Sequence, residues 1–195
     1  MKRITLVFGM ILIMLQGLFA QIDGKLVDVR DGKEYRTTKI GDQIWMAQNL
    51  DFQMEGSWSY QNNEENEHIF GRLYNWESAI KACPAGWHLP SDDEWQKLEK
   101  YLGMPDDDLS KTMAWRGTNQ AKRLVSDSTL MFNLLYGGYR NPPSNYNLLK
   151  MQGFFWTSTG VQGSAWFRQM YEGSDKIFRR TRPDNWAFSV RCIKN

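Results

Sequence analysis

Short segments in which apolar and polar residues alternate follow an apolar run at the N-terminus, and they indicate β-strands. Residues 25–30 and 34–40 predict two strands, and Asp31-Gly32 between them is a strong signal for a tight hairpin turn. Residues 43–47 predict a third strand after another short turn. Residues 51–70 are polar and acidic, and this composition is typical of an exposed loop.

The middle of the chain changes to helical spacing. Apolar residues recur at intervals of three and four from Leu73 to Ile80, and Pro84 ends this first predicted helix. The second helix is predicted to begin at Ser91, because Ser91 and Glu94 have the spacing of a capping box. In such a box each of the two side chains binds the backbone amide of the other residue.

The C-terminal half returns to strands. A short helix is predicted near 119–125, and a long irregular loop is predicted over 140–153. Predicted strands cover residues 132–139, 154–158, 164–170, 176–180 and 187–193. Strands at both ends with helices between them predict an α+β fold rather than alternating βαβ units.

The N-terminus has the layout of a secretory signal peptide. Two basic residues precede an apolar run over residues 4–19, and Ala20 supplies a small residue for cleavage. We therefore expect a signal peptide at 1–20 and a single mature domain at 21–195. The mature protein is expected to have no membrane span and to be secreted or otherwise extracytoplasmic (periplasm, outer surface or extracellular space).

Charge and composition narrow the function only slightly. The chain has 24 basic and 22 acidic side chains, and its two excess basic residues fall in the predicted signal peptide. A mature chain of balanced charge gives no reason to expect nucleic acid or a membrane surface as a partner. The nine tryptophans predict a core of large rings, some of which could line a ligand surface.

The stretch ACPAGWHLPSDDEW (82–95) gathers groups that catalytic and metal sites use. The chain has two cysteines, Cys83 and Cys192, and in an exported protein they are expected to form a disulfide. The acidic residues cap the start of the second helix, which leaves His88 as a lone histidine. We therefore interpret the stretch as a structural joint between the two helices.

Several stretches in a fixed order cover nearly the whole mature chain: DGKEYRTTKIGDQIWMAQNL (31–50), GRLYNW (71–76), ACPAGWHLPSDDEW (82–95), GGYR (137–140), FWTST (155–159) and FSVRC (188–192). This set resembles the Fibrobacter succinogenes major paralogous domain family. The family is similar to C-type-lectin-like and formylglycine-generating-enzyme folds. The resemblance implies two helices that flank a small, twisted, mainly antiparallel sheet, with the chain ends close together. Members are commonly exported proteins of unknown activity, so the resemblance implies a fold more than a function.

The first functional hypothesis is a secreted or cell-surface module that binds a glycan or a protein without catalysis. Folds of this kind often present a long loop beside the sheet as the recognition surface, where rings stack on sugars and amides bond their hydroxyl groups. The candidate ligand-binding residues are Trp58, Tyr139, Arg140, Asn141, Asn145, Tyr146 and Asn147. The alternative is an ordinary solvated loop.

A second hypothesis is the binding of sulfated or acidic polysaccharide by basic residues of the C-terminal strands. The candidate anion-binding residues are Arg168, Arg179, Arg180 and Arg182. The alternative is an edge strand whose positive charge discourages aggregation.

A third hypothesis, a divergent enzyme related to the formylglycine-generating proteins, is disfavoured. Its thiol chemistry needs reactive cysteines, and the chain has only His68 and His88 as histidine ligands for a metal. We predict no catalytic residues, no metal and no cofactor. Calcium-dependent sugar binding has little support, because residues 183–186 have the residue types of such a motif in the wrong order.

Overall fold

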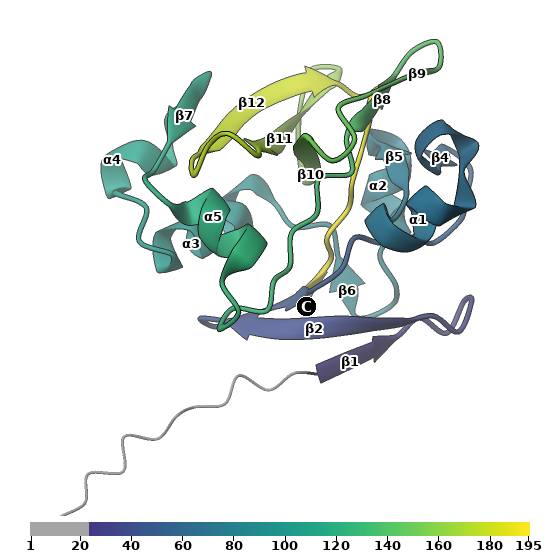
Figure 1. Cartoon of the computed structure of the whole chain (residues 1–195), viewed down its shortest axis with the longest axis horizontal. Helices are drawn as coiled ribbons and strands as arrows, with labels where there is room; N and C mark the ends of the chain where they lie inside the picture. Colours follow the sequence, from purple (N-terminus) through teal and green to yellow (C-terminus); the bar gives the residue numbers. More distant parts are fainter. Residues whose placement is uncertain (1–23) are drawn as a thin grey trace, which may run out of the picture.

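The computed structural model describes residues 24–195 of the chain (Figure 1). The predicted signal peptide, 1–20, lies outside the described residues. Of the residues described, 36% are in strands and 22% are in helices. Nowhere in this range is a helix both long enough and apolar enough to cross a lipid bilayer.

The strands, in chain order, are β1 (Gly24–Val27), β2 (Glu34–Ile40), β3 (Gln43–Met46), β4 (Ser57–Trp58), β5 (Leu73–Asn75), β6 (Trp87–His88), β7 (Ala114–Arg116), β8 (Tyr139–Asn141), β9 (Asn145–Asn147), β10 (Gln152–Val161), β11 (Ser164–Tyr171), β12 (Ile177–Pro183), β13 (Ala187–Phe188) and β14 (Ile193–Lys194). The α-helices are α1 (Glu64–Phe70), α2 (Trp76–Ala82), α3 (Asp92–Tyr101), α4 (Asp106–Leu109) and α5 (Gln120–Ser126), and a 3₁₀ turn spans Tyr60–Asn62.

The strands form three sheets. The first has the order β1-β2-β3-β14-β6, the second β10-β11-β12-β7, and the third β4-β5-β13-β8-β9. In the first sheet β14 lies between β3 and β6, since Ile193 pairs with both Trp45 and His88. The late strand β14 is therefore an interior strand of a sheet whose other members come from the first half of the chain.

The predicted fold class is wrong. The protein is mainly β, with curled antiparallel sheets and half-barrels, and it is not a pair of helices flanking one small sheet in the C-type-lectin-like manner. Many of its strands have only two or three residues, as in β4, β6, β8, β9 and β13. Such strands are too short to give an alternating pattern, so the sequence underestimates the strand content.

Three local predictions are also wrong, and one helix is predicted correctly except for the residue at which it begins. The predicted loop at 51–70 contains helix α1, and the predicted strand at 132–139 has no regular structure before its last residue. The predicted loop at 140–153 contains most of the β8–β9 hairpin. The first predicted helix begins later than expected, because the Asn75 side chain accepts a hydrogen bond from the Ser78 amide (3.0 Å) and caps the helix there.

Three predictions are confirmed. Strands β1 and β2 form the expected antiparallel hairpin around Asp31-Gly32. Ser91 and Glu94 form both hydrogen bonds of the capping box at the start of α3. Cys83 and Cys192 form the disulfide, with their Cα atoms 5.8 Å apart, and this bond joins the end of α2 to the segment before β14.

The core consists mainly of large rings in two clusters. One cluster lies around Trp156, Phe167 and Phe188, whose side chains are fully buried and in mutual ring contact. The other is centred on Trp45 and Trp95, with ring centroids 5.0 Å apart, and packs α3 against the first and second sheets. Strand β10 contributes to both clusters, because successive side chains point to opposite faces of a strand.

Candidate functional site

The candidate ligand-binding residues come together in the third sheet. Tyr139, Arg140 and Asn141 lie in β8 and pair with the residues of β9. Trp58 lies in β4, at the opposite end of the strand order, yet the Arg140 guanidinium is 4.0 Å from its ring centroid. Neighbouring strands lie about 4.8 Å apart, so this contact indicates that the sheet curls and brings β4 toward the hairpin.

The hairpin forms one wall of a shallow hollow of about 520 Å³. Five of the seven candidate residues line it, joined by two polar neighbours that the sequence did not single out. Its lining residues are Gln61, Tyr139, Asn141, Ser144, Asn145, Tyr146 and Asn147. Apart from the two tyrosines, all of them carry an amide or hydroxyl side chain and none is charged.

Hydrogen bonds within the hairpin hold part of this surface in place. Arg140 Nη2 donates to the Pro143 carbonyl (2.8 Å), and Asn147 Nδ2 donates to Asn141 Oδ1 (3.2 Å). The exposed Asn145 side chain forms no hydrogen bond to any residue of the described range. The hollow therefore combines a fixed frame with amide groups that remain available to a ligand.

Two of the four candidate anion-binding residues are buried in internal ion pairs. Arg168 contacts Asp92 (2.6 Å) and Glu99 (2.5 Å), and Arg179 contacts Asp92 (2.5 Å). Arg116 also contacts Glu99 (3.0 Å). We call these five residues the buried ionic cluster. It ties α3 to β7, β11 and β12, and it withdraws Arg168 and Arg179 from the surface.

The other two candidates lie on β12 and are half-buried. The Arg180 guanidinium is 5.7 Å from the Phe178 ring centroid, and that of Arg182 is 4.7 Å from the Trp186 ring centroid. Burial, and then repulsion by Arg182, lower the pKa of Arg180. Within the region described, Arg180 Nε is buried without a hydrogen-bond partner. These two residues are the part of the predicted anion site that a ligand could reach.

We expect acid to weaken the fold through the buried ionic cluster. Burial by itself raises the pKa of Asp92, but hydrogen bonds and charge from Arg179 and Arg168 outweigh it and hold the pKa below its usual value. A carboxylate whose pKa is lowered by folding contributes stability above its unfolded pKa of about 4, and this stability is lost as the pH falls through the folded pKa. Urea unfolding measured from neutral pH downward should show the free energy of unfolding falling below about pH 4.

The matched variants are Asp92→Asn and Asp93→Asn. Asp93 is the exposed neighbour on the same helical turn, so its replacement should leave the acid dependence of stability almost unchanged. Asp92→Asn should lower stability at neutral pH and flatten the dependence below about pH 4. An equally steep acid dependence in Asp92→Asn and the unmodified protein would contradict this role for Asp92.

The stretch at 82–95 connects the end of α2 to the start of α3 by way of β6. His88 Nδ1 lies 2.7 Å from Asn195 Oδ1, and His88 Nε2 lies 2.9 Å from Glu94 Oε1. Burial raises the pKa of Glu94, but hydrogen bonds from Ser91 and His88 more than offset this and leave the pKa lowered. The histidine therefore connects the end of the chain to the start of α3.

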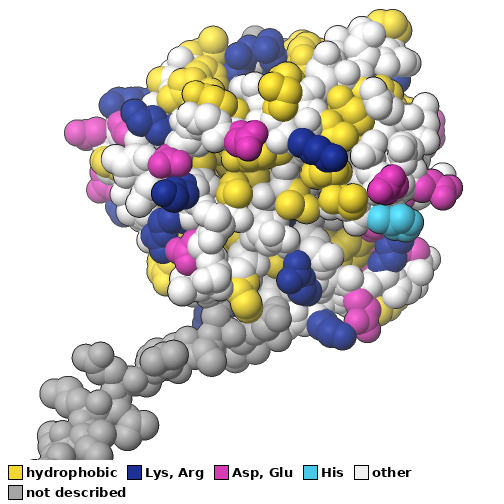
Figure 2. Space-filling model, in the orientation of Figure 1, with side chains coloured by type: hydrophobic (Ala, Val, Ile, Leu, Met, Phe, Trp, Pro, Cys, Tyr) yellow, Lys and Arg dark blue, Asp and Glu magenta, His cyan; other side chains and the backbone are white. Residues whose placement is uncertain are grey.

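No group of three or more His, Cys, Asp or Glu side chains is arranged to hold a metal ion anywhere in residues 24–195. On the face shown in Figure 2, basic and acidic side chains are interspersed. This distribution agrees with the nearly balanced charge of the sequence.

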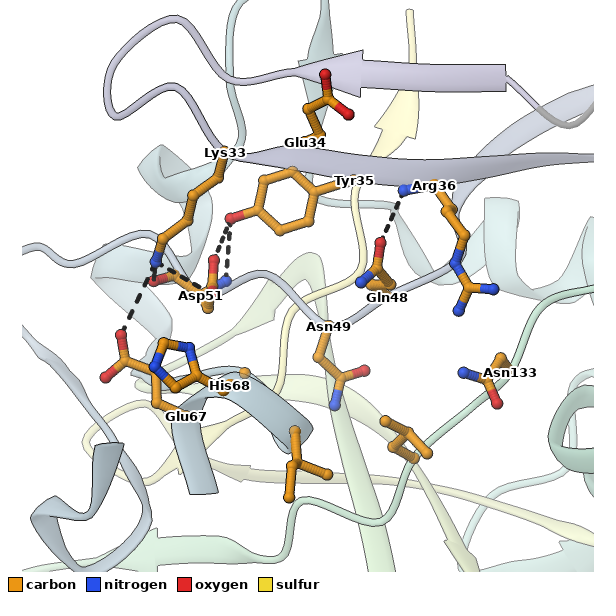
Figure 3. A pocket seen from close by; sticks show the side chains of 13 residues that line it. Lys33, Glu34, Tyr35, Arg36, Gln48, Asn49, Asp51, Glu67, His68 and Asn133 are labelled. Carbon is orange, nitrogen blue, oxygen red and sulfur yellow. Dashed lines mark hydrogen bonds and ion pairs between the residues drawn. The ribbon is translucent and has the colours of Figure 1, made fainter. Parts of the chain in front are cut away.

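Sequence reasoning missed a second pocket, of about 400 Å³ (Figure 3). It lies between β2, the segment after β3, and the C-terminal end of α1, and Asn133 and Leu135 complete it. The lining residues come from three short segments, 33–36, 48–51 and 67–71, and from Asn133 and Leu135 much later in the chain, so no local spacing rule connects them. The sequence signal for this pocket is that residues 31–50 and Gly71, which together supply seven of the thirteen lining residues, belong to the family motifs.

Comparison with known proteins identifies the family of the chain. The model of the Fibrobacter succinogenes major domain matches residues 38–194, which is most of the chain. No curated protein and no solved structure matches the chain.

Proposed function

The chain belongs to the family of the Fibrobacter succinogenes major domain, and from this premise we propose that it is a non-enzymatic binding protein that recognises a neutral glycan. The proposed binding surface is the β8–β9 hairpin with its hollow. The observation that carries the proposal is the grouping of uncharged amide side chains around two tyrosines at one open depression.

The chemistry of this surface suits a sugar. An amide side chain both donates and accepts hydrogen bonds, as a sugar hydroxyl does, so amides match hydroxyl groups in either orientation. The Tyr146 ring is half-buried and packs against Tyr60, with ring centroids 5.2 Å apart, which restricts its movement. A ring held in this way can contact the apolar face of a sugar at little cost in conformational entropy.

In this proposal Trp58 supports the hairpin, although the sequence predicts that it contacts the ligand directly. Its ring is covered by the Arg140 guanidinium, which also lies 5.9 Å from the Tyr146 ring centroid. A cation held against an aromatic face gains about 0.5–1 kcal/mol at an exposed site. Trp58 thus supports the hairpin through Arg140 and does not offer that face of its ring to a sugar.

A location outside the cytoplasm forms part of the same proposal. It is supported by the apolar run at 4–19 and by the disulfide, because disulfides persist in oxidising compartments. Fractionation of cells that produce the tagged full-length chain tests it. Recovery of the protein in the cytoplasm with both cysteines reduced would contradict it.

The experiment for the binding surface is a screen of the purified protein against neutral and sulfated polysaccharides. Tryptophan fluorescence would detect binding, and calorimetry would quantify it. We expect saturable binding to a neutral glycan that falls about tenfold or more in Tyr146→Ala, since a central interface ring typically contributes more than 1 kcal/mol. Adding Asn145→Ala to Tyr146→Ala should reduce the affinity for the glycan further.

Tyr101→Ala provides the matched control, because Tyr101 is an exposed ring on α3 outside the hollow. It should bind as the unmodified protein does. Binding only to sulfated chains, weakened by salt and by Arg180→Gln with Arg182→Gln, would replace this proposal with the anion-binding alternative. Binding that is unchanged in Tyr146→Ala would also exclude the hairpin as the site.

A further inference from the structure

The second pocket has two ends of different chemistry (Figure 3). At one end lie Asp51 and Glu67 with Lys33 between them. Lys33 Nζ is 3.1 Å from Asp51 and 4.0 Å from Glu67. Asp51 also accepts a hydrogen bond from the Tyr35 hydroxyl, and Glu67 is paired with Arg72. The carboxylates at this end are therefore already compensated by the protein itself.

At the other end lies Arg36, whose guanidinium points into the pocket beside Gln48 and toward Asn133. The backbone amide of Arg36 donates to Gln48 Oε1 (2.8 Å), which fixes the Gln48 side chain and leaves its amide nitrogen free to donate. Over the whole described range, the Arg36 guanidinium has no hydrogen-bond or ion-pair partner. This end therefore presents several donors and an unpaired positive charge.

A second cation lies directly behind this end. Arg191 is buried (1% exposed) and donates to Asn49 Oδ1 (2.7 Å), to the Phe132 carbonyl (2.7 Å) and to the Asn133 carbonyl (2.8 Å). Its partners are neutral oxygens, and no carboxylate of residues 24–195 forms an ion pair with it. Burial, with a smaller contribution from Arg36, lowers the pKa of Arg191 to about 9.

A buried charge without a counter-charge is costly, typically by several kcal/mol. Asn49 and Asn133 both line the pocket and both bind Arg191, so the buried cation lies one residue behind the pocket wall. An anion placed against Arg36 would form charge-assisted hydrogen bonds with it and would reduce the repulsion between the two arginines. No carboxylate of residues 24–195 forms an ion pair with Arg36.

We propose that this pocket binds a small polyhydroxy acid, of the size of a hexuronate, with its carboxylate on Arg36. A planar carboxylate matches the fork of a guanidinium. A single negative charge is sufficient, because the pocket presents one unpaired guanidinium, that of Arg36. Gln48 and Asn133 can donate to ligand oxygens, and a pocket of about 400 Å³ is within the range of small-molecule sites. The site shares no residue with the hairpin hollow, so it stands independently of the glycan proposal.

The test is calorimetric titration of D-glucuronate and D-galacturonate into the purified protein, with D-glucose as the ligand that lacks the carboxylate. We expect saturable binding of a uronate that weakens with salt, and glucose should not compete with the uronate for this site. Arg36→Gln should reduce the affinity about tenfold or more, since hydrogen bonds to a charged group contribute roughly 1.5–3 kcal/mol. Arg36→Lys should retain part of the affinity, because it keeps the charge and loses the fork.

Lys97→Gln is the control, since it removes one exposed positive charge from α3, outside the pocket. It should bind uronate as the unmodified protein does, and thermal unfolding should show that all three variants fold. A short oligogalacturonate distinguishes the source of the acid: tighter binding than the monosaccharide indicates the end of an acidic chain, and equal binding indicates a free sugar acid. Absence of uronate binding at tens of millimolar, or equal binding by Arg36→Gln and Lys97→Gln, would overturn the proposal.

Discussion

Glu99→Gln is expected to lower the free energy of unfolding by about 3–5 kcal/mol. Glu99 Oε1 is bound by both Arg116 (3.0 Å) and Arg168 (2.5 Å), and all three side chains are fully buried. Glutamine keeps the size of the side chain but removes its charge, so two buried guanidinium groups lose a counter-charge at once. Urea unfolding followed by tryptophan fluorescence measures the loss.

Glu77→Gln is the control for this change. Glu77 also forms an ion pair, with Lys81 at 2.9 Å, but its side chain is 81% exposed. Exposed pairs of this kind typically contribute less than 1 kcal/mol, so the control should unfold almost as the unmodified protein does. If the two variants lost similar amounts of stability, the buried ionic cluster would not be a main source of stability.

Removal of the Cys83–Cys192 disulfide is expected to lower stability by about 3–5 kcal/mol. The bond joins residues 109 positions apart, and closing so long a loop restricts the unfolded chain strongly. For a chain of this size we expect the melting temperature to fall by about 10 °C or more. Cys83→Ala combined with Cys192→Ala is the suitable variant, because Cys192 is fully buried and alanine adds no polar group there.

Reductant provides an internal check. It should lower the melting temperature of the unmodified protein to near that of the double variant and should leave the double variant unchanged. A melting temperature that does not respond to removal of the bond would mean that the loop is already constrained in the unfolded chain.

Features carried by neighbouring residues could be predicted from the sequence. The β1–β2 hairpin follows from Asp31-Gly32, and the capping box follows from the spacing of Ser91 and Glu94. The ion pairs of Asp92, in contrast, could not be predicted from neighbouring residues. Its position predicts a helix cap, but its carboxylate binds Arg168 and Arg179, which lie 76 and 87 residues away. Local spacing contains no information about partners at that distance.

The same contrast between neighbouring residues and residues far apart in the sequence applies to the two pockets. The closeness of Tyr139, Asn145 and Tyr146 in the sequence predicts that they share one surface, and the hairpin keeps them together. The second pocket depends on Arg36 and Asn133, which only the folded chain brings together. The fold class was missed for a related reason, since three-residue strands such as β8 are defined by their partners and not by a pattern of their own.

The interior position of β14 also sets the order in which the protein can be assembled. A ribosome releases Trp45 and His88 long before Ile193, yet Ile193 is the residue that joins their strands. The first sheet must therefore close after translation of its last strand, and until then β3 and β6 have open edges. During the same interval Cys83 has no native partner. A thiol oxidase acting too early would encounter a single cysteine, so correct oxidation is timed by the arrival of the C-terminal strand.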